Sequence, residues 1–200
     1  MSRERYRDRF DTEKVLTVAN VITAGRIVLI PFFAEFTLQG RYDLAFLIFI
    51  VSGISDGIDG TIARLFRTKS RFGTLLDPIA DKALMVTAFS ILGILKKIPV
   101  WLVVTVISRD IIILGGALFI IIFFGIDGIF VATSSKINTV VQVVTVALVL
   151  AHAGFPELME KFLAERTVIV ETILFYVCEA TALYSGFRYF LSGFRLLSEI

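Results

Sequence analysis

The sequence has one cysteine, Cys178, and one histidine, His152, among its 200 residues. A single cysteine excludes an internal disulfide framework and a cysteine-rich metal site. A single histidine excludes a zinc site built from several histidines. The net charge of +2 is too small to indicate a nucleic-acid partner. Any chemistry must therefore rely on carboxylates, lysine, arginine and hydroxyl groups.

Charged residues are also scarce. They make up 19% of the chain, whereas 56% of the residues are hydrophobic and the mean hydropathy is +0.85. A soluble domain of this size carries roughly 25% charged residues on its surface. The composition therefore excludes a soluble globular protein and a disordered one, and it indicates a membrane protein. The sequence contains no internal repeat or linker, so we expect one domain over residues 15–200.

Long apolar runs are what the sequence has in abundance. A transmembrane helix needs about 20 mostly apolar residues to cross the hydrocarbon layer. Six runs meet this requirement, at residues 16–38, 42–66, 73–95, 99–124, 136–153 and 168–190. They are continuous rather than alternating, which favours helices over strands. We therefore expect an all-α integral membrane protein with six transmembrane helices, in which residues 155–166 form an outer loop.

The first fourteen residues are highly charged and mostly polar. They lack the apolar stretch and cleavage site of a signal peptide. We expect residues 1–14 to form a juxtamembrane amphipathic segment facing anionic headgroups, a solvated tail being the alternative. Of the twenty lysines and arginines, twelve fall on the N-terminal side of the expected membrane and five on the other. The positive-inside rule then places both termini in the cytoplasm.

Four aspartates interrupt the apolar runs around one short loop. Asp56 and Asp59 end the second run, and Asp77 and Asp81 begin the third. Residues three or four apart share one face of a helix, so the two pairs can face each other across an antiparallel hairpin. Clustered carboxylates near hydrocarbon are costly unless cations join them. Oxygen-only ligands favour Mg²⁺ or Mn²⁺, and four carboxylates suffice for two ions.

The aspartates belong to a longer pattern, D-x-x-D-G-x-x-A-R, then eight residues, then G-x-x-x-D-x-x-x-D. All eight fixed positions are present: Asp56, Asp59, Gly60, Ala63, Arg64, Gly73, Asp77 and Asp81. On these residues the sequence resembles the CDP-alcohol phosphotransferase family, which is built of six membrane helices. Segment 20–26 resembles the family's first-helix element, and segments 109–112 and 135–139 resemble its phosphatidylglycerophosphate synthase and eukaryotic-type cardiolipin synthase branches. The aspartate pattern is by far the more specific match.

The resemblance implies a membrane enzyme that transfers a phosphatidyl group from CDP-diacylglycerol to the hydroxyl of an alcohol and releases CMP. It implies that Asp56, Asp59 and Asp77 are metal ligands for Mg²⁺ or Mn²⁺. Asp81 would complete a second metal site and act as the general base. The implied binding residues for the CDP-lipid are Asn20, Thr23, Asp59, Gly60, Ala63, Arg64, Ser70 and Gly73. Arg64 suits this role because guanidinium pairs with phosphate oxygens in a bidentate manner.

The acceptor is assigned less directly. Arg26, Arg109 and Lys136 fall in the cytoplasmic halves or ends of the expected spans. Such a group of cations suits an anionic acceptor, and glycerol 3-phosphate is the acceptor we expect first. Phosphatidylglycerol, which would give cardiolipin, and inositol phosphate are the alternatives. The structural alternatives are an ion pair of Arg109 with a neighbouring acid and a snorkelling Lys136 at a helix end.

A divalent-cation transporter is the rival from another class. It would be expected to have midplane sites between discontinuous helices and internal repeats, which the sequence does not show. The resemblance further implies a homodimer, and we expect it in a bacterial or archaeal cell membrane with the active site facing the cytoplasm. Glu35, Glu171 and Glu179 also interrupt apolar runs. We expect them to form hydrogen bonds between helices or to be short interruptions near the outer surface, without a specific role.

Overall fold

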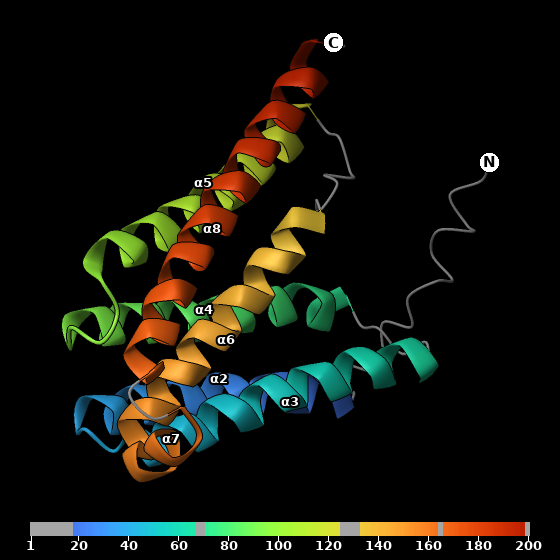
Figure 1. Ribbon diagram of the computed structural model, residues 1–200. Coiled ribbons are helices and arrows are strands. Elements are labelled where there is room, and N and C mark those ends of the chain that lie inside the picture. The colour runs from blue at the N-terminus through green and yellow to red at the C-terminus, as the bar shows by residue number, and fades with distance from the viewer. Residues whose placement is uncertain (1–17, 67–70, 125–132, 164–165, 199–200) are drawn as a thin grey trace. The chain divides into compact units, whose positions relative to one another are not determined.

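The computed structural model (Figure 1) describes residues 18–66, 71–124, 133–163 and 166–198, and side chains over 24–55, 82–116, 135–162 and 166–192. These residues form seven helices and no strand, which confirms the all-α prediction for the part of the chain described. The helices are α2 (Val18–Leu38), α3 (Tyr42–Phe66), α4 (Arg71–Ile94), α5 (Val100–Phe124), α6 (Thr133–Gly154), α7 (Pro156–Leu163) and α8 (Thr167–Ser198). Residues 1–14, the predicted surface segment, lie outside the described residues.

Six of these helices lie where the apolar runs predict them; α3 has the predicted ends, and the ends of most others differ from the prediction by no more than a few residues. The exception is α8, which continues from the predicted end at residue 190 to Ser198. The segment predicted as an outer loop is also different, because it folds into the short helix α7. Its apolar side chains Leu158 and Phe162 are four residues apart and share one helical face. The charged residues Glu157, Glu160 and Lys161 lie between or beside them in the sequence, so this helix is amphipathic.

Contacts divide the chain into two compact units, Met1–Ala88 and Phe89–Ile200, and each has a core of its own. In the first unit, α2 packs against α3. Phe33 and Phe49 meet with ring centroids 6.1 Å apart, and Ala45 is fully buried beside them. The sharp end of α2 uses Gly40 in the left-handed region, with φ of 76°. Glycine adopts this conformation without steric penalty.

In the second unit, α8 packs against both α5 and α6 (Figure 1). The core between these helices contains Leu102 and Val106 of α5, Val146 and Leu150 of α6, and Ala182 of α8, all nearly or fully buried. Helix α7 contacts both α6 and α8. The second unit is therefore a small helical bundle organised around α8.

Two helices in the described residues are long and apolar enough to cross a membrane, over Ser135–Gly154 and Thr167–Ser192. Only 17% of the second segment is buried, and its exposed side chains include Ile173, Leu183 and Phe187. A core helix of a soluble protein would bury most of such a surface. Two shorter apolar helical segments are Tyr42–Ser55 and Lys82–Ile94. The count of six spans stays a prediction.

Candidate functional site

The aspartate signature lies on two successive helices. Asp56, Asp59, Gly60, Ala63 and Arg64 belong to the C-terminal half of α3, and Gly73, Asp77 and Asp81 belong to the N-terminal half of α4. Both halves are continuous helix, so the spacings of three and four residues do place each aspartate pair on one helical face. The side chains of these residues lie outside the described set, as does Ser70. Their predicted meeting around metal ions stays a prediction.

The first-helix residues assigned to the donor, Asn20 and Thr23, lie in the first two turns of α2. Arg26 follows one turn later, and its side chain is only 2% exposed. A guanidinium buried to this degree in an apolar helix must find polar partners. Arg26 therefore belongs to the interior of the protein and is not a surface anchor.

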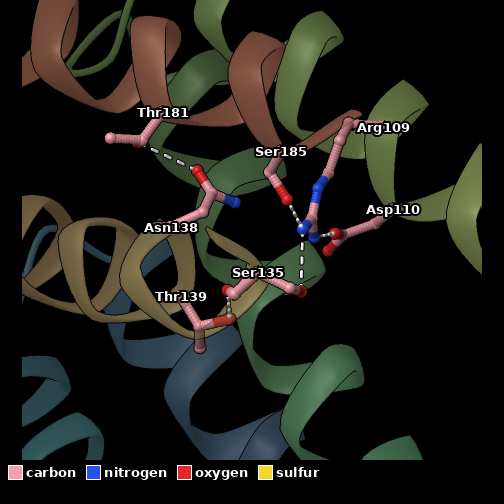
Figure 2. A network of polar contacts seen from close by, with 7 residues as sticks. All are labelled: Arg109, Asp110, Ser135, Asn138, Thr139, Thr181 and Ser185. Atoms are coloured by element: carbon pink, nitrogen blue, oxygen red, sulfur yellow. Dashed lines mark hydrogen bonds and ion pairs between the residues drawn. The ribbon is translucent and has the colours of Figure 1, made fainter. Parts of the chain in front are cut away.

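Arg109 is the centre of a buried hydrogen-bond network in the second unit (Figure 2). Its side chain, 5% exposed, donates from Nη1 to Oδ1 of Asp110 at 2.6 Å. Its Nη2 donates to Oγ of Ser135 on α6 at 2.8 Å and to Oγ of Ser185 on α8. One guanidinium thus joins α5, α6 and α8. Its charge is met by the carboxylate of the next residue, an ion pair that the sequence left open as the structural alternative.

Lys136 follows Ser135 in the first turns of α6, and its side chain is exposed. Arg109 and Lys136 therefore differ in kind, although both were predicted to bind the acceptor. Arg109 holds three helices together from inside, whereas Lys136 lies beside the anchored serine and is accessible. That either contacts an acceptor stays a prediction.

A stripe of polar residues continues from this network along α6. Asn138 and Gln142 are at most 1% exposed, and Thr145 is fully buried. With Ser135 they are spaced by three, four and three residues, so they lie on one helical face. Across the interface, Thr181 of α8 donates to Oδ1 of Asn138 at 3.0 Å (Figure 2). Lipid supplies little hydrophobic driving force between helices, so such polar contacts help to hold them together.

The stripe is not fully satisfied. Nδ2 of Asn138, both amide atoms of Gln142 and Nε of Arg109 are buried and have no hydrogen-bond partner within the described residues. A buried polar group without a partner costs about 1–3 kcal/mol. The same helices therefore retain hydrogen-bonding capacity directly beside the Arg109 network, next to Lys136.

The prediction for the glutamates within apolar runs has different outcomes for Glu35, Glu171 and Glu179. Glu179 of α8 accepts a hydrogen bond from Thr105 of α5 at 2.9 Å, and Glu171 of α8 lies 2.8 Å from Nδ1 of His152 on α6. For these two residues the prediction of hydrogen bonds between helices is confirmed. The bond of Glu35 is local instead, because it accepts from Gln39 one turn further along the chain, at 3.0 Å.

Sequence reasoning missed Ser185 and Thr181, and it did not single out Asp110 among the acids that could pair with Arg109. A small hydroxyl side chain within an apolar run gives no distinctive signal, and Ser185 is 76 residues from the arginine that it contacts. The sequence did indicate part of the network, because segment 135–139, which contains Ser135 and Asn138, resembles a segment of the family. Within the described residues, no group of three or more His, Cys, Asp or Glu side chains could hold a metal ion.

A protein-family model describing CDP-alcohol phosphatidyltransferases matches residues 16–182. This match covers the signature on α3 and α4 and the residues of the polar network except Ser185. The chain belongs to the CDP-alcohol phosphatidyltransferase family.

Relatives of two kinds are similar to this chain. A probable CMP-forming cardiolipin synthase of Drosophila melanogaster is 34% identical over 72% of this chain and 52% of its own length. A putative cardiolipin synthase of Mycobacterium tuberculosis is 41% identical over 51% of this chain and 49% of its own length. The chain thus spans about half the length of these curated relatives.

The second kind aligns nearly end to end. A CDP-diacylglycerol–glycerol-3-phosphate 3-phosphatidyltransferase of Bacillus subtilis is 29% identical over 92% of this chain and 98% of its own length. The cardiolipin synthase relatives thus have higher identity over 51–72% of the chain, and the Bacillus subtilis relative has lower identity over 92% of it. The two kinds of relative carry the names of different enzymes of the family, so they do not fix the acceptor of this chain.

Proposed function

We propose that the protein transfers a phosphatidyl group from CDP-diacylglycerol to the hydroxyl of an alcohol, with release of CMP. The observation that carries the proposal is the complete signature, in register on two successive helices inside the family match. In the reaction, the acceptor oxygen bonds to the phosphorus that bears diacylglycerol, and the phosphoanhydride bond to CMP breaks. The hydroxyl proton passes to a base.

The four aspartates of the signature fit hard divalent cations, because such cations prefer oxygen ligands and carboxylates supply only oxygen. We propose that Asp56, Asp59, Asp77 and Asp81 hold Mg²⁺ or Mn²⁺, with room for two ions. Bound there, the ions would neutralise pyrophosphate charge and polarise the phosphorus. Asp81 would accept the hydroxyl proton. Arg64 would pair with phosphate oxygens of the donor, and Gly60, Ala63 and Gly73 would let the donor approach the helix backbone.

Asn20 and Thr23 would approach the donor from α2, and Ser70 from the connection between α3 and α4. The same proposal includes a homodimer in a bacterial or archaeal cell membrane, with the active site and both termini on the cytoplasmic side. The excess of cations on the N-terminal side supports this orientation. Accessibility of cysteines introduced near residue 5 and in α7 to an impermeant thiol reagent, in a Cys178→Ala background, would measure it.

Glycerol 3-phosphate is our first candidate for the acceptor. The relative from Bacillus subtilis, whose name specifies this acceptor, aligns over 92% of this chain and 98% of its own length. An anionic acceptor also suits the exposed Lys136 and the buried Arg26. Arg109 would act in part through Ser135, which it anchors beside Lys136. Phosphatidylglycerol is the second candidate because the cardiolipin synthase relatives have the higher local identities.

The test is release of CMP by the purified protein from CDP-diacylglycerol, with Mg²⁺ or Mn²⁺ and one acceptor at a time. Glycerol 3-phosphate, phosphatidylglycerol, inositol phosphate and buffer alone form the panel. We expect rapid release with glycerol 3-phosphate only. Release with phosphatidylglycerol only would make the protein a cardiolipin synthase. Absence of CMP with every acceptor and both metals, from a folded protein, would contradict the proposed reaction.

A further inference from the structure

The second unit contains a cavity of about 400 Å³ at the end of the bundle where α4 leads into α5 and α6 leads into α7. Its lining includes Lys96 and Lys97 from the α4–α5 turn, His152 from α6, Pro156 from α7 and Glu171 from α8. With histidine neutral, these groups give the cavity a net charge of +1, and with histidine protonated +2. The cavity is therefore polar and electropositive at one end of two apolar helices.

Lys96 occupies a backbone position that ordinarily favours glycine. Its φ is 58°, in the left-handed region. The N–H of Lys96 donates to the carbonyl of Gly93, and the N–H of Lys97 donates to the carbonyl of Leu92, which together form a Schellman turn. The same turn ends α2, where Gly40 holds the corresponding position. A lysine is disfavoured relative to glycine in this conformation, so the ammonium group of Lys96 is kept at the cavity at the expense of backbone stability.

His152 and Glu171 close the cavity from the side of the bundle. Nδ1 of His152 lies 2.8 Å from Oε1 of Glu171. Their side chains are 37% and 15% exposed, so the carboxylate is the more enclosed partner. The carboxylate is thus occupied by a histidine of the neighbouring helix, while the two lysines, both exposed, complete the other wall of the cavity.

The cavity lies at the level expected for lipid headgroups. His152 is two residues from the end of the apolar segment Ser135–Gly154, and Glu171 is in the second turn of the segment Thr167–Ser192. Nearby, Trp101 of α5 stacks on Tyr176 of α8 with ring centroids 5.6 Å apart, and both rings are partly exposed. Tryptophan and tyrosine concentrate at membrane–water interfaces. The amphipathic α7, with Phe162 75% exposed, has the character of an interfacial helix.

This end is remote from the Arg109 network within the same unit. Ser135, a partner of Arg109, and His152 are 17 residues apart on the continuous helix α6. At 1.5 Å rise per residue this separation is about 25 Å, which approaches the roughly 30 Å thickness of the hydrocarbon layer. The two polar sites of the bundle therefore lie near opposite membrane surfaces, and the cavity is separate from the acceptor residues proposed above.

We propose that this cavity binds the phosphate of an anionic phospholipid from the leaflet that faces it, with Lys96 and Lys97 as the phosphate-binding groups. The chemistry shared with a soluble ligand is a phosphate between two ammonium groups. The lipid is favoured because Trp101 and Tyr176 follow the cavity residues Lys97 and Glu171 by about one helical turn along the chain, and the amphipathic α7 begins at the cavity residue Pro156. Their exposed apolar surface suits acyl chains. The proposal does not depend on the reaction proposed for the protein.

Trp101 supplies a local reporter because it is the single tryptophan of the chain. The full protein would be reconstituted in phosphatidylcholine vesicles with increasing brominated phosphatidic acid or, in parallel, brominated phosphatidylcholine, and quenching of Trp101 fluorescence would be recorded. Phosphatidic acid is neither the donor nor an acceptor in the proposed reaction. We expect stronger quenching by phosphatidic acid at equal mole fraction. Each lysine removed should raise the half-quenching mole fraction about fivefold.

The variants are Lys96→Gly, Lys97→Gln and the matched control Lys161→Gln, which removes a lysine of α7 outside the cavity lining. Lys96→Gly suits the left-handed turn, so the variant should fold at least as well as the parent, and its thermal unfolding would show this. The control should quench like the parent. Equal quenching by the two brominated lipids, or excess quenching unchanged in both cavity variants, would overturn the proposal.

A second arm separates lipid from soluble phosphate. Inorganic phosphate would be titrated into the delipidated protein in detergent by calorimetry, and we expect no binding below about 10 mM because the acyl chains are missing. Submillimolar binding that is lost in Lys96→Gly would overturn the lipid assignment and make the cavity a site for a soluble phosphate compound. CMP release is measured on the same variants, which separates the proposed reaction from the proposed lipid site. A variant that loses quenching by phosphatidic acid but releases CMP at the normal rate is informative about the cavity alone.

Discussion

The signature on α3 and α4 and the Arg109 network of α5, α6 and α8 are built in different ways. The first consists of two short groups of residues, each ordered along one helix. The second takes single residues from three helices, with contacts between residues 26 and 76 positions apart. The signature contains four carboxylates on two helices, whereas the network neutralises its arginine with one aspartate. We therefore propose metal chemistry for the first region and positioning for the second, and the experiments below test this division.

Removal of divalent cations should have the largest effect of all. We expect EDTA to abolish CMP release, since the four aspartates would then repel one another and the donor's pyrophosphate. Mg²⁺ or Mn²⁺ should restore the rate, and Zn²⁺ should be a poor substitute because the site lacks nitrogen and sulfur ligands. The measurement is CMP release after chelation and after each metal is added back. Full activity in the chelator would remove the signature region from metal chemistry.

Asp81→Asn should separate binding from catalysis. The amide preserves the shape of the side chain and one oxygen ligand, but it cannot accept the hydroxyl proton. Loss of a general base lowers a rate by about 10²- to 10⁴-fold. We expect kcat to fall within this range, while the Kd for CDP-diacylglycerol, measured directly, changes much less. Near-normal turnover would assign the base to another residue.

Lys136→Ala and Arg109→Ala should raise the KM for a phosphorylated acceptor by about ten- to a hundredfold, the cost of a lost charged hydrogen bond. The KM for CDP-diacylglycerol should stay within a few-fold of that of the parent. Steady-state kinetics with each substrate varied in turn is the measurement. A selective rise in the donor KM would move these residues to the CDP-lipid site.

The roles of Arg109 and Lys136 can be distinguished by protein stability. Arg109→Ala breaks the buried ion pair with Asp110, and breaking a buried ion pair costs about 3–5 kcal/mol. Lys136→Ala removes an exposed side chain and should leave the melting temperature unchanged. Ser185→Ala is the milder probe of the network, because it removes one partner and keeps the guanidinium. If Ser185→Ala changes the acceptor KM without changing stability, the network positions the acceptor site.

The smallest expected effect concerns packing between α4 and α5. A Cβ added at Gly93 would lie 2.8 Å from Cγ2 of Val103, whereas a Cβ at Gly115 would meet nothing within 4 Å. Gly93→Ala should therefore destabilise the protein by about 1–3 kcal/mol through overpacking. Gly115→Ala, the matched control, should be neutral or stabilising by up to about 1 kcal/mol through helix propensity. Thermal unfolding of both variants in detergent would compare them, and equal melting temperatures would show that Val103 moves aside at little cost.

The helix positions followed closely from the sequence because long apolar runs and helical periodicity are local properties. The run at residues 42–66 matches α3 in both of its ends. The alignment of Asp56 with Asp59 was equally predictable, since 3.6 residues per turn fixes it. The prediction that residues 155–166 form a loop was wrong, and the reason is also local. The mixed charges of this segment reduced the apolar signal, although the alternation of Leu158 and Phe162 with charged residues suits a short amphipathic helix.

By itself, then, the sequence determined the helical class, the course of six helices and the family to which the chain belongs. The tertiary structure decided which charges are paired and where polar groups meet. It gave Arg109 its partner Asp110 and its contacts with Ser135 and Ser185, joined Glu179 to Thr105, and brought Lys96 to the same cavity as His152. The physical reason is that helical periodicity sets positions along one helix, whereas contacts between helices depend on their rotation and depth, which packing over the whole interface establishes.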